Sequence, residues 1–226
     1  MALILSIETS TMVCSVALHK NGELLASQNH QVEKSHSSLL PEIGLEVCKE
    51  ANMTFSDLDA VAVSSGPGSY TGLRIGVTNA KGICYTLNKP LIAIPSLDVI
   101  AEAVRGKFLG DHLLCPMMDA RRMEVYTQIE DQTGKIIWEL QPKILDENTF
   151  GEFDKPLYLF GDGMPKFREI SNQDNLIFID DIFPEAKNMG RLARERFDAQ
   201  DFEDVAYFEP NYLKEWRTTK PKKQLL

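Results

Sequence analysis

An Asn-Gly pair at positions 21 and 22, set between two alternating apolar and polar runs, most constrains how this chain folds. The runs cover residues 13–19 before the pair and 23–28 after it. A two-residue hairpin of this kind needs positive φ at both central positions, which Asn and Gly adopt most readily. Together with a strand predicted over residues 2–7, the pattern predicts an antiparallel three-stranded meander at the start of the chain.

Helical and extended patterns alternate after the meander. A first helix is predicted from apolar residues at helical spacing, namely Leu39, Leu40, Ile43 and Val47. A strand over residues 59–64, a helix over 72–87 and a strand over 91–94 follow. Because a helix between two strands usually makes those strands parallel, the pattern predicts a partly parallel sheet in an α/β fold.

The signal weakens after about residue 105. Strands are predicted over residues 113–118, 123–129, 135–140, 157–160 and 176–179, and an amphipathic helix over 186–197. We therefore predict two α/β domains, with residues 1–98 forming the first and residues 99–226 a smaller second one. The end of the chain could return to the first domain. No internal repeat is visible in the sequence.

Charge excludes some functions. The chain has 24 basic and 33 acidic residues, a net charge of −9, which disfavours a general nucleic-acid binder acting alone. The segment from Lys214 to Leu226 differs, with five basic residues and one acidic. It is either a solvated chain end or a contact to RNA or an acidic partner. No signal peptide or membrane span is evident, so a cytoplasmic protein without membrane contact is expected, its four cysteines reduced in the core.

A glycine-containing loop over residues 66–72 follows a predicted strand and opens a helix, where backbone N–H groups can hold an anion. It matches neither common phosphate-binding pattern, because its third glycine comes one residue late and Leu73 stands where a lysine would be. Hydroxyl groups at the end of the first strand could add to it. The candidate residues of this vestigial phosphate loop are Thr9, Ser10, Gly66, Gly68 and Ser69. The alternative is a set of turns that satisfy their own backbone groups.

Catalytic and metal-binding patterns are absent from the sequence. None of the four histidines is spaced for two metal ligands on one helical face; His36 would need a partner at position 40, which is Leu40. No G-x-S-x-G motif occurs. The segment Asp119-Ala-Arg-Arg122 is interpreted as a charged turn whose groups pair locally. We therefore predict no catalytic residues and no metal site.

The second predicted helix carries small residues at every fourth position. Each interior glycine costs a helix about 1 kcal/mol relative to alanine, so this stripe indicates close packing against a neighbour. The neighbour is either the sheet of the same domain or another protein. In the second case the two helices form a partner or dimer interface through Leu39, Leu40, Ile43, Val47, Gly72, Leu73, Gly76 and Ala80.

Several motifs together resemble the TsaB (YeaZ) family. They are Ile4-Leu-Ser-Ile-Glu-Thr-Ser10, Cys14-Ser-Val-Ala-Leu18, Ser35-His-Ser-Ser-Leu-Leu-Pro41, Ser65-Gly-Pro-Gly-Ser-Tyr-Thr-Gly-Leu-Arg-Ile-Gly76, Asp119-Ala-Arg-Arg-Met-Glu-Val-Tyr126 and Pro210-Asn-Tyr-Leu213. The resemblance is dense over residues 1–126 and thin afterwards. It implies an actin-like, sugar-kinase-like fold of two related α/β domains with mixed sheets.

The resemblance also implies a function. Members act in bacterial synthesis of N6-threonylcarbamoyladenosine at position 37 of tRNAs that read ANN codons, as a non-catalytic subunit that binds the catalytic paralogue TsaD. The ATPase TsaE joins that complex, a homodimer forms when the subunit is alone, and tRNA is contacted indirectly or through the basic tail. This chain itself would need no cofactor, with ATP or ADP used by the complex. The older glycoprotease-like label of the family has no chemical support here, because the metal ligands that such an activity needs are missing. The alternative is an independent small kinase or ATPase of the same fold.

Overall fold

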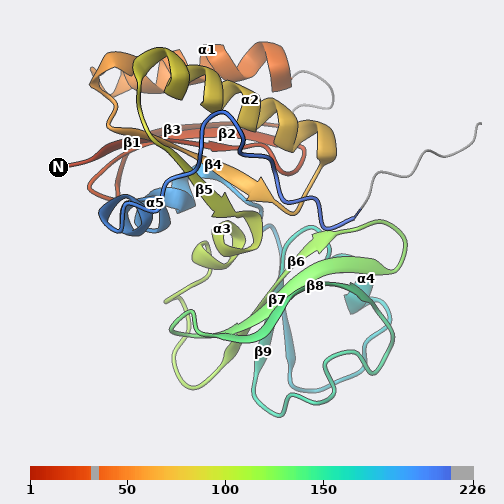
Figure 1. The fold of residues 1–226 in the computed structure, drawn as a ribbon. Helices are drawn as coiled ribbons and strands as arrows, with labels where there is room; N and C mark the ends of the chain where they lie inside the picture. Colours follow the sequence, from red (N-terminus) through yellow and green to blue (C-terminus); the bar gives the residue numbers. More distant parts are fainter. Residues whose placement is uncertain (32–35, 215–226) are drawn as a thin grey trace, which may run out of the picture.

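The computed structural model describes residues 1–31 and 36–214 (Figure 1). Its first sheet has five strands in the order β3-β2-β1-β4-β5. The antiparallel part is the predicted meander, with β1 (Leu3–Glu8), β2 (Val13–Lys20) and β3 (Glu23–Gln31). The parallel part adds β4 (Ala60–Gly66) and β5 (Leu91–Pro95). The sequence-based prediction of a mixed sheet is confirmed.

Two long helices cover one face of this sheet (Figure 1). They are α1 (His36–Glu50) and α2 (Tyr70–Leu87), with a short helix η1 (Phe55–Asp57) between them in sequence. Ser69 caps the start of α2 by accepting a hydrogen bond from the Gly72 N–H at 3.2 Å. The helix ends at Asn88, whose left-handed backbone (φ +51°) lets its N–H reach the Cys84 carbonyl.

The other face of the first sheet is covered by elements distant in sequence. These are α3 (Ser96–Glu102), η2 (Ala186–Met189) and α5 (Gly190–Asp198). Ala186, Met189 and Ala193 are buried in one cluster with Ile4 of β1 and with Ala2, which precedes that strand. The chain therefore returns from the second domain, and the helix predicted over 186–197, which begins as a 3-10 turn, packs on the first sheet.

The second sheet has the order β10-β9-β6-β7-β8. Its strands are β6 (Leu113–Asp119), β7 (Glu124–Asp131), β8 (Ile136–Ile144), β9 (Leu157–Phe160) and β10 (Leu176–Ile179). Starting from β8, the order is β8-β7-β6-β9-β10, which corresponds strand by strand to β3-β2-β1-β4-β5 of the first sheet. The directions correspond as well, with β8, β7 and β6 antiparallel and β6, β9 and β10 parallel. Two related α/β domains with mixed sheets are thus present, and the predicted fold class is confirmed.

Helix α3 joins the two halves by packing against both sheets. Val99 lies in the cluster under the first sheet, whereas Leu97 and Ile100 contact Leu114 and Met118 of the second. The four cysteines are buried and form no disulfide. In the described part of the chain, no helix combines the length and the apolar character that crossing a membrane requires.

Candidate functional site

The residues predicted to form a partner interface lie inside the first domain. Leu40, Ile43 and Val47 of α1 are at most 2 % exposed and pack in one cluster with strands β1, β2 and β4. Leu73 and Ala80 of α2 are fully buried as well. Leu39 is half-buried against the same cluster. The apolar stripes of both helices pack against the sheet of the same domain. The residues that the sequence predicted for a partner interface therefore need correction.

The small-residue stripe of α2 has the same explanation. A Cβ at Gly72 would lie 2.1 Å from the Thr9 carbonyl oxygen, and one at Gly76 would lie 2.3 Å from Thr9 Oγ1. Thr9 Oγ1 donates a hydrogen bond to the Gly72 carbonyl at 2.8 Å. The glycines therefore allow α2 to approach the end of β1 until backbone meets backbone. Of the two neighbours left open by the sequence, the sheet is the one observed.

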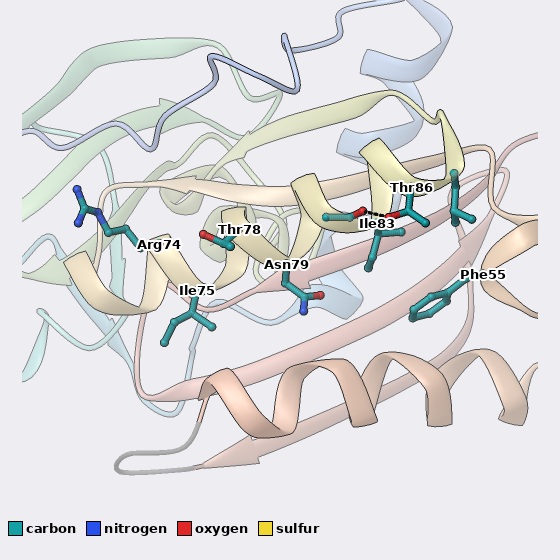
Figure 2. A pocket seen from close by; sticks show the side chains of 9 residues that line it. Phe55, Arg74, Ile75, Thr78, Asn79, Ile83 and Thr86 are labelled. Atoms are coloured by element: carbon teal, nitrogen blue, oxygen red, sulfur yellow. Dashed lines mark hydrogen bonds between the residues drawn. The ribbon is translucent and has the colours of Figure 1, made fainter.

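The outward side of α2 borders a groove of about 640 Å³ (Figure 2). Ile75 and Asn79 project from α2 toward α1, and Phe55 closes one end. Gly82 also lines the groove, and a Cβ added there would meet no atom within 4 Å. The complete lining is Phe55, Arg74, Ile75, Thr78, Asn79, Gly82, Ile83, Thr86 and Leu87. This groove lies on the outer surface of the first domain, along α2, and sequence periodicity did not identify it.

The candidate phosphate loop is assembled, but its members bind one another. The Ser69 N–H donates to the Ser10 carbonyl at 2.7 Å, and a Cβ at Gly68 would lie 2.5 Å from the same oxygen. The Gly72 N–H is bonded to the Ser69 hydroxyl. On the other side, a Cβ at Gly66 would lie 2.7 Å from the Asn211 carbonyl oxygen. At least two N–H groups that could bind a phosphate are thus already engaged.

Glu8 lies beneath this loop at the end of β1 and has no exposed surface. One carboxylate oxygen, Oε1, accepts from the Ser10 N–H at 2.5 Å, whereas Oε2 and the Ser10 hydroxyl have no hydrogen-bond partner in the part of the chain that the structure describes. Burial raises the pKa of Glu8 to about 7, although the hydrogen bond from the Ser10 N–H opposes the rise. The carboxyl is held within the domain rather than displayed in a cleft.

Residues that could bind a metal do not come together. Within residues 1–31 and 36–214, no three His, Cys, Asp or Glu side chains are close enough to hold an ion. The side chain of His36 lies outside this described part. Leu40, at the position of the expected second ligand, is buried among apolar neighbours.

The turn at 119–122 differs from the prediction of local pairing. Asp119 pairs with Lys166 of α4 (Pro165–Arg168), and not with Arg121 or Arg122. Asp119 instead accepts a hydrogen bond from the backbone N–H of Arg121 at 3.1 Å. The carboxylate therefore organises the turn and leaves both guanidinium groups outside it.

A C-terminal strap, residues 203–214, crosses the first domain (Figure 1). The sequence left a return of the chain end to this domain open but predicted none of its contacts. Lys81 of α2 donates to the carbonyls of Ala206 at 2.9 Å and Phe208 at 3.1 Å. The Tyr212 ring lies 4.6 Å from that of Tyr70, and Lys214 pairs with Glu124 in the second domain. Much of the strap is held through backbone carbonyls, which leave no residue pattern. Of the basic tail, residues 215–226 lie outside the described structure.

Comparisons with known proteins agree on one family. Residues 23–213 match the family described as "TsaD: tRNA N6-adenosine threonylcarbamoyltransferase". The chain is 32 % identical over 166 residues to the tRNA threonylcarbamoyladenosine biosynthesis protein TsaB of Bacillus subtilis, with 70 % of each chain covered. It is 27 % identical to TsaB of Escherichia coli, with 93 % of this chain and 94 % of that one covered. The solved structure of YeaZ from Pseudomonas aeruginosa superposes with a TM-score of 0.80 at 26 % identity, covering 94 % of this chain and all of that one.

Proposed function

The chain belongs to the TsaB family and takes part in tRNA threonylcarbamoyladenosine biosynthesis, and from that premise we propose its role. It is a non-catalytic subunit that binds and supports a TsaD-like catalytic subunit, which forms N6-threonylcarbamoyladenosine at position 37 of tRNAs reading ANN codons. A TsaE-like ATPase joins through the complex. ATP or ADP is used at that level and not by this chain alone.

The groove along the outer side of α2 carries this proposal. It is apolar at Ile75, Ile83 and Phe55, and it holds the open notch at Gly82, where the ridge of a partner helix fits. Tyr85 of α2, 85 % exposed, lines a second hollow together with Gly82 and so extends the apolar area beside the groove. A stable interface needs about 1,000 Å² of total buried area, which two adjacent helices can supply. A second copy of this chain would use the same surface when the catalytic subunit is absent.

The alternative of an independent kinase or ATPase has less support. Phosphate transfer needs free N–H donors and a carboxylate that reaches the nucleotide and its metal ion. Here the Ser69 and Gly72 N–H groups are bonded within the chain, and Glu8 is enclosed. Opening this site for a nucleotide would require separation of the loop from Ser10.

Reconstitution tests the proposal. Purified catalytic subunit, ATPase and tRNA are assayed for modified adenosine with and without this chain, and the chain alone is assayed for ATP and peptide hydrolysis. We expect modification to depend on the chain, and no turnover by the chain alone. ATP hydrolysis that is lost when Thr9 or Ser10 is changed to alanine would instead support the independent enzyme.

A further inference from the structure

The turn between β6 and β7 holds two consecutive arginines in the left-handed backbone region. The φ angle is +70° at Arg121 and +52° at Arg122. Residues other than Gly, Asn and Asp seldom adopt this region, because Cβ then approaches the following carbonyl oxygen. A turn that keeps two arginines in this conformation must be held by its surroundings, and such turns often have functional roles.

Neighbouring side chains hold the turn through its backbone. Lys166 donates to the carbonyl of Arg122 at 2.9 Å and to that of Glu124 at 2.6 Å. Asp119 accepts from the Arg121 N–H, and its own N–H donates to Asp162 Oδ1 at 3.0 Å. The charged groups closest to the turn are therefore engaged in fixing its path, and Asp119 is neutralised by Lys166.

The two guanidinium groups are left without a carboxylate. Both arginines are exposed, and among residues 1–31 and 36–214 neither side chain makes an ion pair or a hydrogen bond. Arg74 donates to the Tyr212 hydroxyl. The remaining arginines of the described chain all pair with carboxylates, namely Arg105, Arg168, Arg191, Arg194 and Arg196. The turn thus displays two uncompensated cations side by side on a rigid base.

A second source of positive charge begins beside this turn. Lys214, at the end of the strap, pairs with Glu124 and lies 5.5 Å from the Tyr126 ring. The sequence then continues with Arg217, Lys220, Lys222 and Lys223. The strap therefore brings the start of the basic tail to the part of the second domain that carries the two arginines.

We propose that the Arg121–Arg122 turn is a contact site for the phosphate backbone of RNA, an inference that rests on the proposed role in tRNA modification. Guanidinium groups bind phosphate oxygens in a bidentate manner, and two fixed neighbours match two successive phosphates. An acidic chain repels RNA over most of its surface, so a local contact of this kind orients the RNA more than it attracts it.

The test uses the full chain assembled with its catalytic subunit and a labelled tRNA transcript that reads an ANN codon, with binding measured at several salt concentrations. The test variant is Arg121→Asn with Arg122→Asn, because asparagine tolerates positive φ and so preserves the turn. We expect the slope of log affinity against log salt to fall by roughly two, and affinity near 0.1 M salt to fall roughly tenfold. The matched control, Lys107→Asn with Lys135→Asn, removes two charges at the opposite end of the second sheet and should change neither quantity.

Further outcomes separate the explanations. Arg121→Lys with Arg122→Lys keeps both charges and should restore most of the salt slope. An unchanged slope in the asparagine variant overturns the inference, and weaker binding to the catalytic subunit at that unchanged slope would assign the arginines to an acidic protein surface instead. If the unaltered assembly fails to form or to bind tRNA, the proposed function fails, and this inference fails with it.

Discussion

Glu8 and Asp119 occupy equivalent places in the two repeats, since each ends the central strand of a five-stranded sheet of the same order. Glu8 is sealed beneath the loop that follows β4, with its pKa raised to about 7 by burial. Asp119 is about half exposed and pairs with a lysine. The same strand order thus places a buried carboxyl group in the first domain and a solvent-exposed charged turn in the second.

The covering of the sheets explains this difference. The first sheet carries helices of 15 and 18 residues on one face, and α2 presses the loop onto Ser10. The connection between β9 and β10 has only the four-residue helix α4. The backbone approach itself is similar in both repeats, because a Cβ at Gly161 would lie 2.2 Å from the Met117 carbonyl oxygen and one at Gly72 would lie 2.1 Å from that of Thr9. The helices of the first repeat therefore close over its strand ends, whereas the second repeat keeps its strand ends accessible.

The largest effect should come from filling the contact between α2 and β1. Replacing Gly76 by leucine places new atoms against Thr9, where even a Cβ would lie 2.3 Å from Oγ1. We expect a loss of about 3 kcal/mol in the free energy of unfolding, at the upper end for overpacking, or roughly 6–12 °C in Tm for a chain of this size. Chemical and thermal denaturation measure it.

The control for this change is Gly82→Ala on the outer side of the same helix. Its Cβ meets open space, so the substitution should stabilise the chain by up to about 1 kcal/mol through helix propensity. Equal losses of stability in the two variants would mean that both sides of α2 are packed within the domain.

A pH-dependent effect of at most the same size should come from Glu8→Gln. The pKa of Glu8 is raised from 4.5 to about 7, so the folded state keeps a proton that the unfolded state releases. The native chain therefore loses stability as pH rises from about 4.5 to 7, by up to about 3 kcal/mol. The glutamine variant should equal the native chain at pH 4.5 and exceed it at pH 8 by a similar amount, as measured by denaturant unfolding. A variant that is less stable at pH 8 would show that the Glu8 carboxylate is satisfied in its charged form.

The smallest effect should come from Asp119→Asn in the second repeat. The ion pair with Lys166 is partly exposed, and asparagine can still accept the hydrogen bond from the Arg121 N–H. We expect a loss of between 0 and about 1 kcal/mol at pH 7, with the opposite sign to Glu8→Gln. A gain in stability at pH 7 would remove the contrast between the two repeats.

Sequence patterns predicted the helices and strands better than the tertiary contacts between them. The Asn-Gly hairpin and the Asn88 helix end follow from local backbone preferences, and both were predictable. The spacing of Gly72, Gly76 and Ala80 shows that they share a face, but it does not name what that face contacts. That contact is Thr9, more than sixty residues earlier, so only the tertiary structure could identify it.

Three further features leave no pattern in the sequence, for related reasons. The repeat is carried by strand order, and its two copies differ in helix length and in side chains, so no periodic similarity remains in the sequence. The strap depends on Lys81 binding the carbonyls of Ala206 and Phe208, which any residues at those positions would supply. The groove could not be read from the sequence either, because it is formed by the tertiary arrangement of several elements and not by a residue pattern within one of them.

The central claim is that the outer groove of α2 binds the catalytic subunit, and a matched pair of substitutions tests it most directly. Asn79→Trp fills the groove, and Asn172→Trp places the same side chain at an exposed position of the second domain. Affinity for the purified TsaD-like subunit is measured by calorimetry, with melting as a check of folding. We predict that Asn79→Trp weakens binding at least about tenfold, corresponding to about 1.4 kcal/mol, while Asn172→Trp binds like the native chain. Native affinity for a folded Asn79→Trp variant would contradict the account.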